Sequence, residues 1–380
     1  MIEVAKRLNS VEEYYFSRKL KEVAFLKSQG KPIINLGIGS PDLEPPFKAS
    51  MMLRDSLDDE GAHKYQSYQG LPELRDAVET FYKDRYKVTI NGKTEVLPLM
   101  GSKEGIMHIS MAFLNKGDEV LIPNPGYPTY ASVTKLLEAK PIYYDLTEEN
   151  NWLPDFVALE RLDLSKVKIM WISYPHMPTG ANAPNKFYDE VIAFGRRHNI
   201  LIVHDNPYSF VLNKKPISIM RYNYAKEVCI ELNSLSKTFN MAGWRVGFMV
   251  GSYEHLAAVL KVKSNMDSGM FYGIQKGAIE ALQCSDMWYV SLNSVYELRR
   301  ALVWKLAEKL NCTYDEYATG MFVWAKLPPN ITSEAFADKV LKEHSIFIAP
   351  GTVFGSNGEG YVRFSLCAPE STIKEAIARV

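Results

Sequence analysis

The 380-residue sequence has few cysteines and histidines and no long apolar run. Its four cysteines are scattered without a Cys-x-x-Cys pair, so neither a disulfide framework nor a zinc site is indicated. None of the seven histidines forms a cluster with metal-ligand spacing, and we predict no metal. Because no stretch offers 18 consecutive apolar residues, no membrane span is expected.

Charge of one sign is also not in excess. Lysine plus arginine and aspartate plus glutamate number 44 each, which indicates neither a nucleic acid nor an acidic membrane surface as a partner. The first 30 residues alternate charged and apolar side chains with helical spacing, and they predict a helical arm rather than a signal peptide. The length suits one large domain and one smaller domain, and the composition and scattered cysteines favour a cytoplasmic protein.

The most informative stretch is SLSKTFNMAGWRVG, which contains Lys237. The apolar run VCIEL before it predicts a buried strand, and α/β proteins place their chemistry just past such strand ends. Ser234, Ser236 and Arg245 stand close to the lysine in the sequence, and their hydroxyl and guanidinium groups can bind a phosphate. The pattern therefore predicts that Lys237 forms a Schiff base with a phosphorylated aldehyde cofactor.

Two other predicted strands end in polar residues. The strand TEVLPLM runs into Gly101, Ser102 and Lys103, which open a helix. Such a start forms an anion site because the first N–H groups are unpaired, although an ordinary capping turn has the same pattern. The strand ILIVH ends at Asp205, whose burial would be unfavourable without a partner. A protonated ring nitrogen is one such partner, and a role as a turn former before Asn-Pro is the alternative.

Together these segments resemble the class I/II aminotransferases, the fold type I enzymes that use pyridoxal 5′-phosphate (PLP). The resemblance extends from Gly39 to Arg363, with seven motifs in the family's order. It implies an α/β fold whose large domain holds a mostly parallel seven-stranded sheet, beside a smaller α+β domain. We expect an N-terminal arm and part of the small domain in residues 1–45, the PLP-binding domain in 46–285 and the small domain in 286–380.

The resemblance also assigns roles to individual residues. It implies that Ser102, Lys103 and the lysine segment bind the cofactor, and that Tyr127 stacks on its ring. Tyr208 can donate to the cofactor's phenolic oxygen. The turn at Gly39 resembles the one that meets the substrate carboxylate. Arg363, with apolar and aromatic neighbours in YVRFSL, matches the arginine that clamps this carboxylate; an internal salt bridge is the alternative.

Further features concern the partner subunit and the substrate. Tyr65 resembles the tyrosine that reaches across a dimer interface to the partner's cofactor phosphate, which implies a homodimer with shared sites. Tyr15 in the arm is a candidate for binding the substrate side chain. One departure is Met177, which stands where the family has an asparagine that donates to the phenolic oxygen. Methionine cannot make that bond. The segment SNMDSGMFYG holds no arginine for a side-chain carboxylate, so aspartate specificity is not indicated.

Three classes of function follow. The first is an aminotransferase that moves an amino group from an L-amino acid to a 2-oxo acid, with 2-oxoglutarate as the expected acceptor, by ping-pong chemistry. The second is a PLP-dependent C–S β-lyase of the cystathionine type on the same fold. The third is a transcription regulator with an aminotransferase-like domain, for which the segment before Gly39 is too short to fold as a winged helix.

Overall fold

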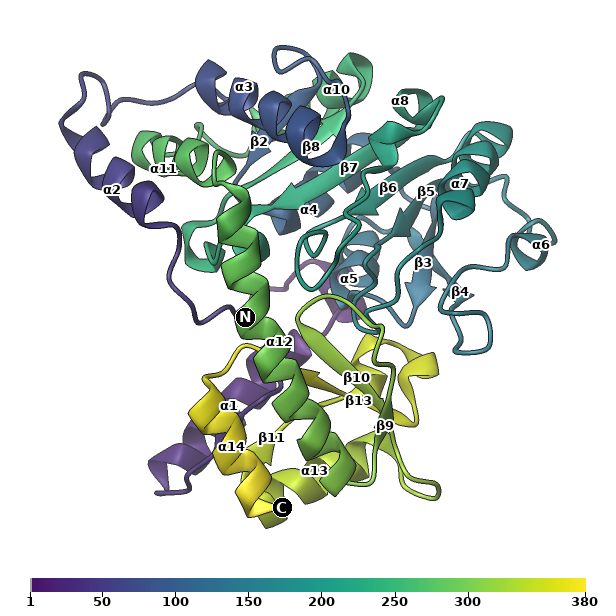
Figure 1. Cartoon of the computed structure of the whole chain (residues 1–380). Helices are drawn as coiled ribbons and strands as arrows, with labels where there is room; N and C mark the ends of the chain where they lie inside the picture. Colours follow the sequence, from purple (N-terminus) through teal and green to yellow (C-terminus); the bar gives the residue numbers. More distant parts are fainter. Residues whose placement is uncertain (1) are drawn as a thin grey trace.

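The computed structural model describes residues 2–380, and its largest element is a seven-stranded sheet (Figure 1). Strand β8 runs antiparallel to both of its neighbours, and the other adjacent strands are parallel. This confirms the mostly parallel seven-stranded sheet that the sequence predicts. In spatial order the strands are β2 (Val96–Leu99), β8 (Gly247–Gly251), β7 (Cys229–Ser234), β6 (Leu201–Asp205), β5 (Val167–Ile172), β3 (Glu119–Asn124) and β4 (Lys140–Asp145).

Both faces of this sheet are covered by helices, which explains why its strands are continuous apolar runs rather than alternating ones. On β6, Leu201 and Val203 pack into one apolar cluster with residues of α4, α5 and α10. Ile202 between them faces the other cluster, with residues of α3, α7 and α11. The helices of this large body are α2 (Phe47–Asp55), α3 (Pro72–Phe81), α4 (Ser102–Phe113), α5 (Pro128–Leu136), α6 (Phe156–Leu159), α7 (Asn185–His198), α8 (Ala225–Val228), α9 (Leu235–Thr238), α10 (Tyr253–Lys263) and α11 (Tyr272–Leu282).

A second, smaller body lies below the large one in Figure 1 and has its own apolar core. Both ends of the chain contribute to it, since β1 of the N-terminal region pairs in parallel with β11. An antiparallel sheet has the strand order β12-β13-β10-β9. The elements are α1 (Tyr15–Ser28), β1 (Ile34–Asn35), β9 (Thr313–Tyr314), β10 (Phe322–Lys326), α13 (Ser333–His344), β11 (Ile346–Phe347), β12 (Ala349–Pro350), β13 (Tyr361–Ser365) and α14 (Glu370–Arg379).

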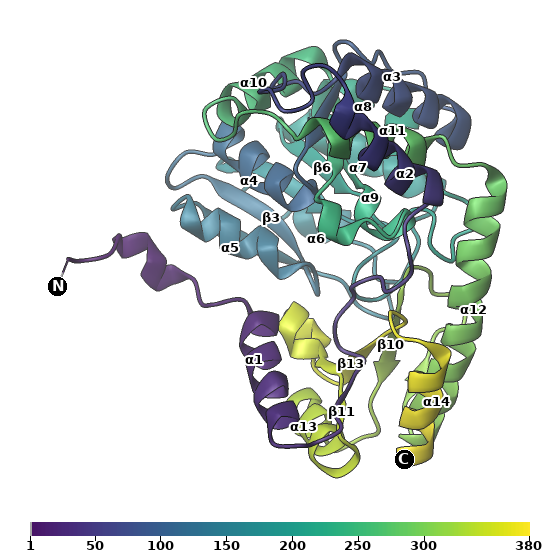
Figure 2. The same ribbon diagram turned by 90° about the vertical axis from the view of Figure 1, so that its left-hand side faces the viewer.

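One long helix, α12 (Asp286–Lys309), runs from the large body into the small one (Figures 1 and 2). Tyr289 near its start packs into a core of the large body, and Leu292 one turn later packs into the core of the small body. The sequence predicts this helix at residues 286–310, within one residue of its observed end. The domain boundaries after residues 45 and 285 stay a prediction.

The N-terminal region differs from the expected helical arm. Residues Lys6–Ser10 form a short 3₁₀ helix, and the α-helix begins only at Tyr15. Figure 2 shows the preceding segment running outward from the rest of the chain. The run PIINLGIG predicts a strand at residues 32–39, but the observed strand covers only Ile34–Asn35, since the glycine-containing stretch after it forms a loop. The other short turns are η2 (Ser56–Asp58), the π-helical η3 (Tyr82–Tyr86), η4 (Ile219–Arg221), η5 (Ala242–Trp244), η6 (Gly351–Phe354) and η7 (Ser356–Gly358). None of the helices within residues 2–380 is both long and apolar enough to cross a membrane.

Candidate active site

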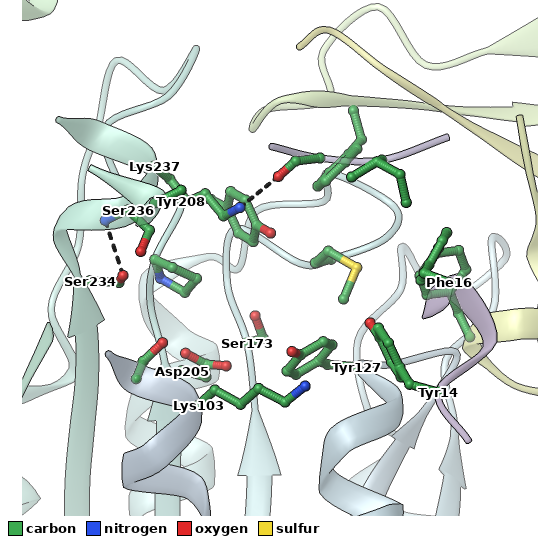
Figure 3. A pocket seen from close by; sticks show the side chains of 18 of the residues that line it. Tyr14, Phe16, Lys103, Tyr127, Ser173, Asp205, Tyr208, Ser234, Ser236 and Lys237 are labelled. Atoms are coloured by element: carbon green, nitrogen blue, oxygen red, sulfur yellow. Dashed lines mark hydrogen bonds between the residues drawn. The ribbon is translucent and has the colours of Figure 1, made fainter. Parts of the chain in front are cut away.

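A cavity of about 780 Å³ opens between the two bodies, beside the carboxyl ends of the parallel strands (Figure 3). Ligands of open α/β sheets bind at this edge. Its walls combine residues from the loop after β1, from the strand ends of the large sheet and from β10 and β13 of the small body. The predicted site residues that line it are Gly39, Ser102, Lys103, Tyr127, Asp205, Tyr208, Ser234, Ser236, Lys237, Arg245 and Arg363.

Lys237 lies in the one-turn helix α9, directly after β7. Its Nζ donates a hydrogen bond to the carbonyl oxygen of Gly39 at 2.6 Å. Burial lowers the pKa of the amine from 10.5 to about 8, and the nearby positive charges of Arg363 and Arg245 also lower it. A lysine of this kind is neutral, and hence nucleophilic, in a much larger fraction than an exposed lysine at neutral pH.

The start of α4 and the lysine segment form a polar cradle. Gly101 precedes α4 with φ +91°, and a Cβ there would lie 2.2 Å from Nη2 of Arg245. The guanidinium is held by a hydrogen bond from Nη1 to the carbonyl oxygen of Ala242 at 3.0 Å. Ser234 Oγ accepts the backbone N–H of Ser236 at 3.1 Å. Hydroxyl groups, the first N–H groups of a helix and a guanidinium therefore meet in one place, which suits a phosphate.

Asp205 ends β6 with its side chain in the cavity wall and 5% of its surface exposed. Oδ2 accepts the hydroxyl of Tyr130 at 2.8 Å, and Oδ1 is buried without a partner within residues 2–380. Burial raises the pKa of this carboxyl to about 6, while the Tyr130 hydrogen bond and the charge of His204 lower it. A buried carboxylate oxygen without a donor is expected to receive one from a ligand.

Arg363 on β13 is also buried, with 5% exposed. Its Nη2 donates to the carbonyl oxygen of Gly37 at 2.9 Å, and its guanidinium carbon lies 3.8 Å from the ring centroid of Phe322 and 4.6 Å from that of Phe354. No carboxylate within residues 2–380 forms an ion pair with it, so the structure does not contain the salt bridge that is the alternative role of this residue. Burial lowers its pKa to about 10.

Met177, the departure from the family pattern, lies in the same wall and is buried. Its Sδ is 3.3 Å from Nη1 of Arg363. Sulfur is a weak acceptor, so this contact leaves most of the donor capacity of Nη1 for a ligand. The thioether therefore borders the arginine in the place where the family has an amide.

Two predicted residues are not in the cavity wall. Tyr15 packs against the core of the small body and does not line the cavity, whereas its neighbours Tyr14 and Phe16 pack against the same core and also line the cavity. The role of Tyr15 in binding the substrate side chain therefore stays a prediction. Tyr65 is 90% exposed on the surface of the single chain. Its predicted role requires a second subunit, so it stays a prediction.

Several residues that line the cavity were not predicted from the sequence. Tyr130 follows Tyr127 by about one helical turn, so the two side chains point to the same side, toward the cavity. There Tyr130 donates its hydroxyl to Asp205. Tyr14 also lines the cavity and lies beside Tyr127 (Figure 3). Phe322 and Phe354 reach the site from the small body, and no local pattern indicates this. A Cβ at Gly39 would lie 2.2 Å from Phe322 Cζ, so this close packing requires glycine.

One group of metal-ligand residues exists away from the cavity. Side-chain atoms of Glu104, His108 and Asp267 lie within 4.8 Å of one another. The ammonium group of Lys263 donates to Asp267 Oδ2 at 2.7 Å, and Glu104 Oε1 lies 3.0 Å from Nε2 of His108. The two carboxylates thus have partners in the chain itself. The absence of a metal stays a prediction.

The arrangement fits PLP on observations made at three positions. The amine of Lys237 has a lowered pKa, and Oδ1 of Asp205 is free to accept a ring N–H. Because Gly101 has no side chain, the guanidinium of Arg245 can lie directly beside the start of α4. These are the aldehyde, nitrogen and phosphate ends of the cofactor. Fold and site together define a fold type I enzyme that uses PLP.

Comparison with known proteins identifies the family. The sequence profile described as "Aminotransferase class I and II" matches residues 31–380. Curated relatives include LL-diaminopimelate aminotransferases of Dehalococcoides mccartyi, 39% identical over 100% of this chain and 98% of the relative, and of Oleidesulfovibrio alaskensis, 39% identical over 99% and 98%. Similar solved structures include BacF from Bacillus subtilis, with TM-score 0.95, 37% identity and coverage of 100% and 98%, and an aminotransferase from Staphylococcus aureus, with TM-score 0.90, 32% identity and coverage of 99% and 98%.

The chain belongs to the class I and II aminotransferases. It is therefore a PLP-dependent enzyme that transfers an amino group from an amino acid to a 2-oxo acid. The comparisons support this transfer and do not support the β-lyase alternative.

Proposed function

We propose that this aminotransferase acts on dicarboxylic substrates, with 2-oxoglutarate as the acceptor and LL-diaminopimelate as the donor. One observation carries the proposal: Arg363 and Lys103 line the same cavity, and within residues 2–380 neither forms an ion pair with a carboxylate. Each proposed substrate carries two carboxylates, one beside the reacting carbon and one at the far end. Two separated cations suit such a molecule. The donor is the amino acid in the names of the relatives.

The orientation of Lys103 favours the substrate over the cofactor. Its Nζ lies 4.7 Å from the ring centroid of Tyr14, and Figure 3 shows it turned toward Tyr14 and Tyr127, away from Ser234 and Ser236. Burial and the charge of Arg245 lower its pKa. A partly desolvated ammonium group without an anion gains more from a carboxylate than an exposed one would. Lys103 would thus bind the distal carboxylate, whereas the sequence alone predicts it as a cofactor ligand.

In the proposed mechanism, Ser102, Ser234, Ser236 and Arg245 hold the cofactor phosphate, and Asp205 holds the ring nitrogen. When bound, PLP supplies an electron sink that takes up the pair left by the breaking Cα–H bond. Arg363 binds the α-carboxylate of the donor with its planar fork. The neutral amine of Lys237 would then remove the proton from Cα and return it to C4′ of the cofactor, as a general acid–base catalyst. Tyr127 and Tyr208 line the same cavity, where Tyr127 would stack on the cofactor ring and Tyr208 would donate to its phenolic oxygen.

The experiment uses the PLP-loaded enzyme and a panel of single L-amino acids without acceptor. We expect LL-diaminopimelate and L-glutamate to remove the visible absorbance band and to release the corresponding 2-oxo acids. Steady-state rates with 2-oxoglutarate then rank the donors by kcat/KM. Bleaching by neither dicarboxylic amino acid would contradict the proposal. Pyruvate and ammonia appearing while the band persists would indicate elimination instead of transfer.

Replacing Lys103 by methionine tests the second cation directly. We expect kcat/KM for LL-diaminopimelate to fall about tenfold to a hundredfold, mainly through KM, because a charge-assisted hydrogen bond to the distal carboxylate is lost. A monocarboxylic donor such as L-alanine should be affected little. Lys21→Met is the matched control, since Lys21 also lines the cavity but is paired with Glu13 at 2.7 Å. An equal loss for both donors would assign Lys103 to the cofactor.

A second candidate donor is an aromatic amino acid. The cavity wall contains the rings of Tyr14, Phe16, Tyr127, Phe322 and Phe354, which could pack against an aromatic side chain. Among the similar solved structures is an aromatic aminotransferase from Pyrococcus horikoshii, at 29% identity. Bleaching by L-tyrosine or L-phenylalanine but not by LL-diaminopimelate would favour this candidate.

The proposed assembly is a homodimer in which Tyr65 of each subunit contacts the cofactor phosphate of the other. The 90% exposure of this tyrosine in the single chain supports the proposal. Mixing Tyr65→Ala and Lys237→Ala subunits at limiting PLP should restore activity, because each mixed dimer has one site with both residues intact. Mixing Lys237→Ala with Asp205→Asn is the matched control: these two residues line one cavity of one chain, so no mixed site is intact. Restoration in both mixtures, or in neither, would contradict the shared site.

A cytoplasmic location also stays a prediction.

A further inference from the structure

Two titratable side chains behind the active site take no part in the mechanism above. His204 on β6 and Glu231 on β7 are partners in the register of the two parallel strands, and neither side chain is exposed to solvent. Nδ1 of His204 lies 2.9 Å from Oε2 of Glu231. His204 directly precedes Asp205, and successive side chains of a strand point to opposite faces. The pair therefore lies on the other side of β6 from the cavity.

The surroundings of Glu231 stabilise a negative charge. Oε1 accepts the hydroxyl of Tyr82 at 2.6 Å, and Oε2 accepts the backbone N–H of Ile219 at 2.9 Å in addition to its contact with His204. Donors to both oxygens favour the ionised form of a carboxyl group. The carboxylate also needs a cation in the same dry environment, because an unpaired buried charge is strongly unfavourable.

The partners of His204 are oxygen atoms at both of its ring nitrogens. Its second ring nitrogen, Nε2, lies 3.0 Å from the carbonyl oxygen of Tyr174, while the backbone N–H of Tyr174 donates to the same nitrogen over a longer 3.4 Å. The shorter of the two contacts is the one to the oxygen. Both ring nitrogens thus face oxygen acceptors at hydrogen-bond distance. A neutral imidazole has one N–H, and only the imidazolium can donate to both oxygens.

Other titratable groups around the pair stay neutral. The ring of Tyr188 lies edge-on to His204 at 5.8 Å between centroids. Burial raises the pKa of Tyr82, Tyr86 and Tyr188 and of the Cys229 thiol well above their ordinary values. The remaining titratable side chains in this part of the sheet are His204, Glu231 and the neighbouring Asp205.

We propose that His204, held as an imidazolium by Glu231, is a positioning residue that keeps the buried carboxyl group of Asp205 ionised. The proposal rests on the proposed role of Asp205 toward the cofactor ring nitrogen. An ion pair without solvent exposure is a weak source of stability, since apolar residues of similar volume often do as well. Its value here would be functional: a cation one residue away offsets the burial that disfavours the Asp205 carboxylate. The charge of His204 acts on that carboxyl in the same direction as the Tyr130 hydrogen bond.

The protonation state is measured first, on wild-type apoenzyme carrying ¹⁵N-labelled histidine. We expect both ring nitrogens of His204 to be protonated at neutral pH, with the signal assigned by its loss in His204→Gln. A ring nitrogen without a proton would overturn the proposal. This measurement does not depend on whether a variant folds or on the activity of the loaded enzyme.

The functional test is the pH dependence of kcat/KM and of PLP affinity. In His204→Gln the acidic limb of both pH profiles should move to higher pH by about one unit, because loss of a nearby cation raises the pKa of the Asp205 carboxyl group. Glu231→Gln should move it the same way, since His204 then loses its proton. If Glu231 acted on Asp205 only through its own charge, its removal would move the limb downward. His198→Gln, which breaks a partly exposed pair with Glu160 at 2.8 Å, is the matched control and should leave the limb unchanged.

The remaining outcomes separate this proposal from the function on which it rests. A lower melting temperature with an unmoved acidic limb in His204→Gln, while Asp205→Asn is inactive, would assign the pair a purely structural role and overturn the proposal alone. Full activity of Asp205→Asn would remove the role of Asp205 itself, and with it both claims.

Discussion

Replacing Lys237 by alanine is expected to lower transaminase activity at least about ten-thousand-fold. The substitution removes both the amine that holds the cofactor and the general base, and a general base alone contributes about a hundredfold to ten-thousand-fold. The fold should persist, because the side chain makes one hydrogen bond, to the Gly39 carbonyl oxygen, and no ion pair within residues 2–380. Steady-state assays and thermal melting measure the two effects separately.

The pH dependence of cofactor loading gives an independent test of Lys237. The neutral amine is the reactive form, and its pKa is lowered from 10.5 to about 8. About a tenth of the molecules then carry a neutral amine at pH 7, and most do above pH 9. The rate of PLP loading into apoenzyme should rise through pH 8 and then level off, followed by absorbance at fixed PLP concentration.

The control for both experiments is Lys339→Ala, which removes an exposed lysine whose contact with Glu343 is 4.0 Å long. It should change neither the activity nor the loading profile. A loading rate that keeps rising toward pH 10 would mean that the amine is not desolvated as the structure indicates. Substantial activity in Lys237→Ala would require another base in the cavity.

The large sheet and much of the site could be predicted from local sequence because parallel strands bring their carboxyl ends to one edge. Asp205 and Lys237 each follow an apolar run, and β6 and β7 are indeed neighbours. Any polar residue just after such a run is thus a candidate for the same cavity. The glycine and serine that open α4 follow the same rule, since unpaired N–H groups gather at a helix start.

Tyr15 shows where local pattern stops being sufficient. Consecutive residues of a helix point about 100° apart, so an error of one position turns the side chain from one surface to another. All three of Tyr14, Tyr15 and Phe16 pack against the core of the small body, but only Tyr14 and Phe16 also line the cavity. The orientation of α1 depends on that body, whose core joins residues from both chain ends. Nothing within the first 30 residues specifies this contact.

Partners far apart in the sequence were equally beyond prediction. Arg363 donates to the carbonyl oxygen of residue 37, 326 positions earlier in the chain. The ion pair of His204 and Glu231 depends on the register of β6 and β7, which periodicity does not define when both faces of the strands are buried. In the sequence, His204 is the last residue of the run ILIVH, directly before Asp205. The two oxygens next to its ring nitrogens come from two other segments.

Replacing Arg363 by alanine is expected to lower kcat/KM about a hundredfold to a thousandfold for donor and acceptor alike. Both substrates carry a carboxylate next to the reacting carbon, and truncating one partner of a buried, hydrogen-bonded charge pair costs about 2–5 kcal/mol. Arg363→Lys keeps the charge but loses the planar fork, so it should still be about tenfold below wild type. The two half-reactions, followed by absorbance with each substrate alone, separate donor from acceptor.

The stability of Arg363→Ala distinguishes a substrate-binding arginine from a structural one. Burial lowers the pKa of Arg363 to about 10, so the charged form is disfavoured in the folded chain before substrate arrives. Removing an unpaired buried cation should therefore leave the melting temperature unchanged or raise it. Arg221→Ala, at an exposed position outside the cavity, is the control for general effects of losing an arginine. A lower melting temperature with normal kcat/KM would show that Arg363 supports the small body, and a loss restricted to one substrate would contradict its assignment to the α-carboxylate, which both substrates carry.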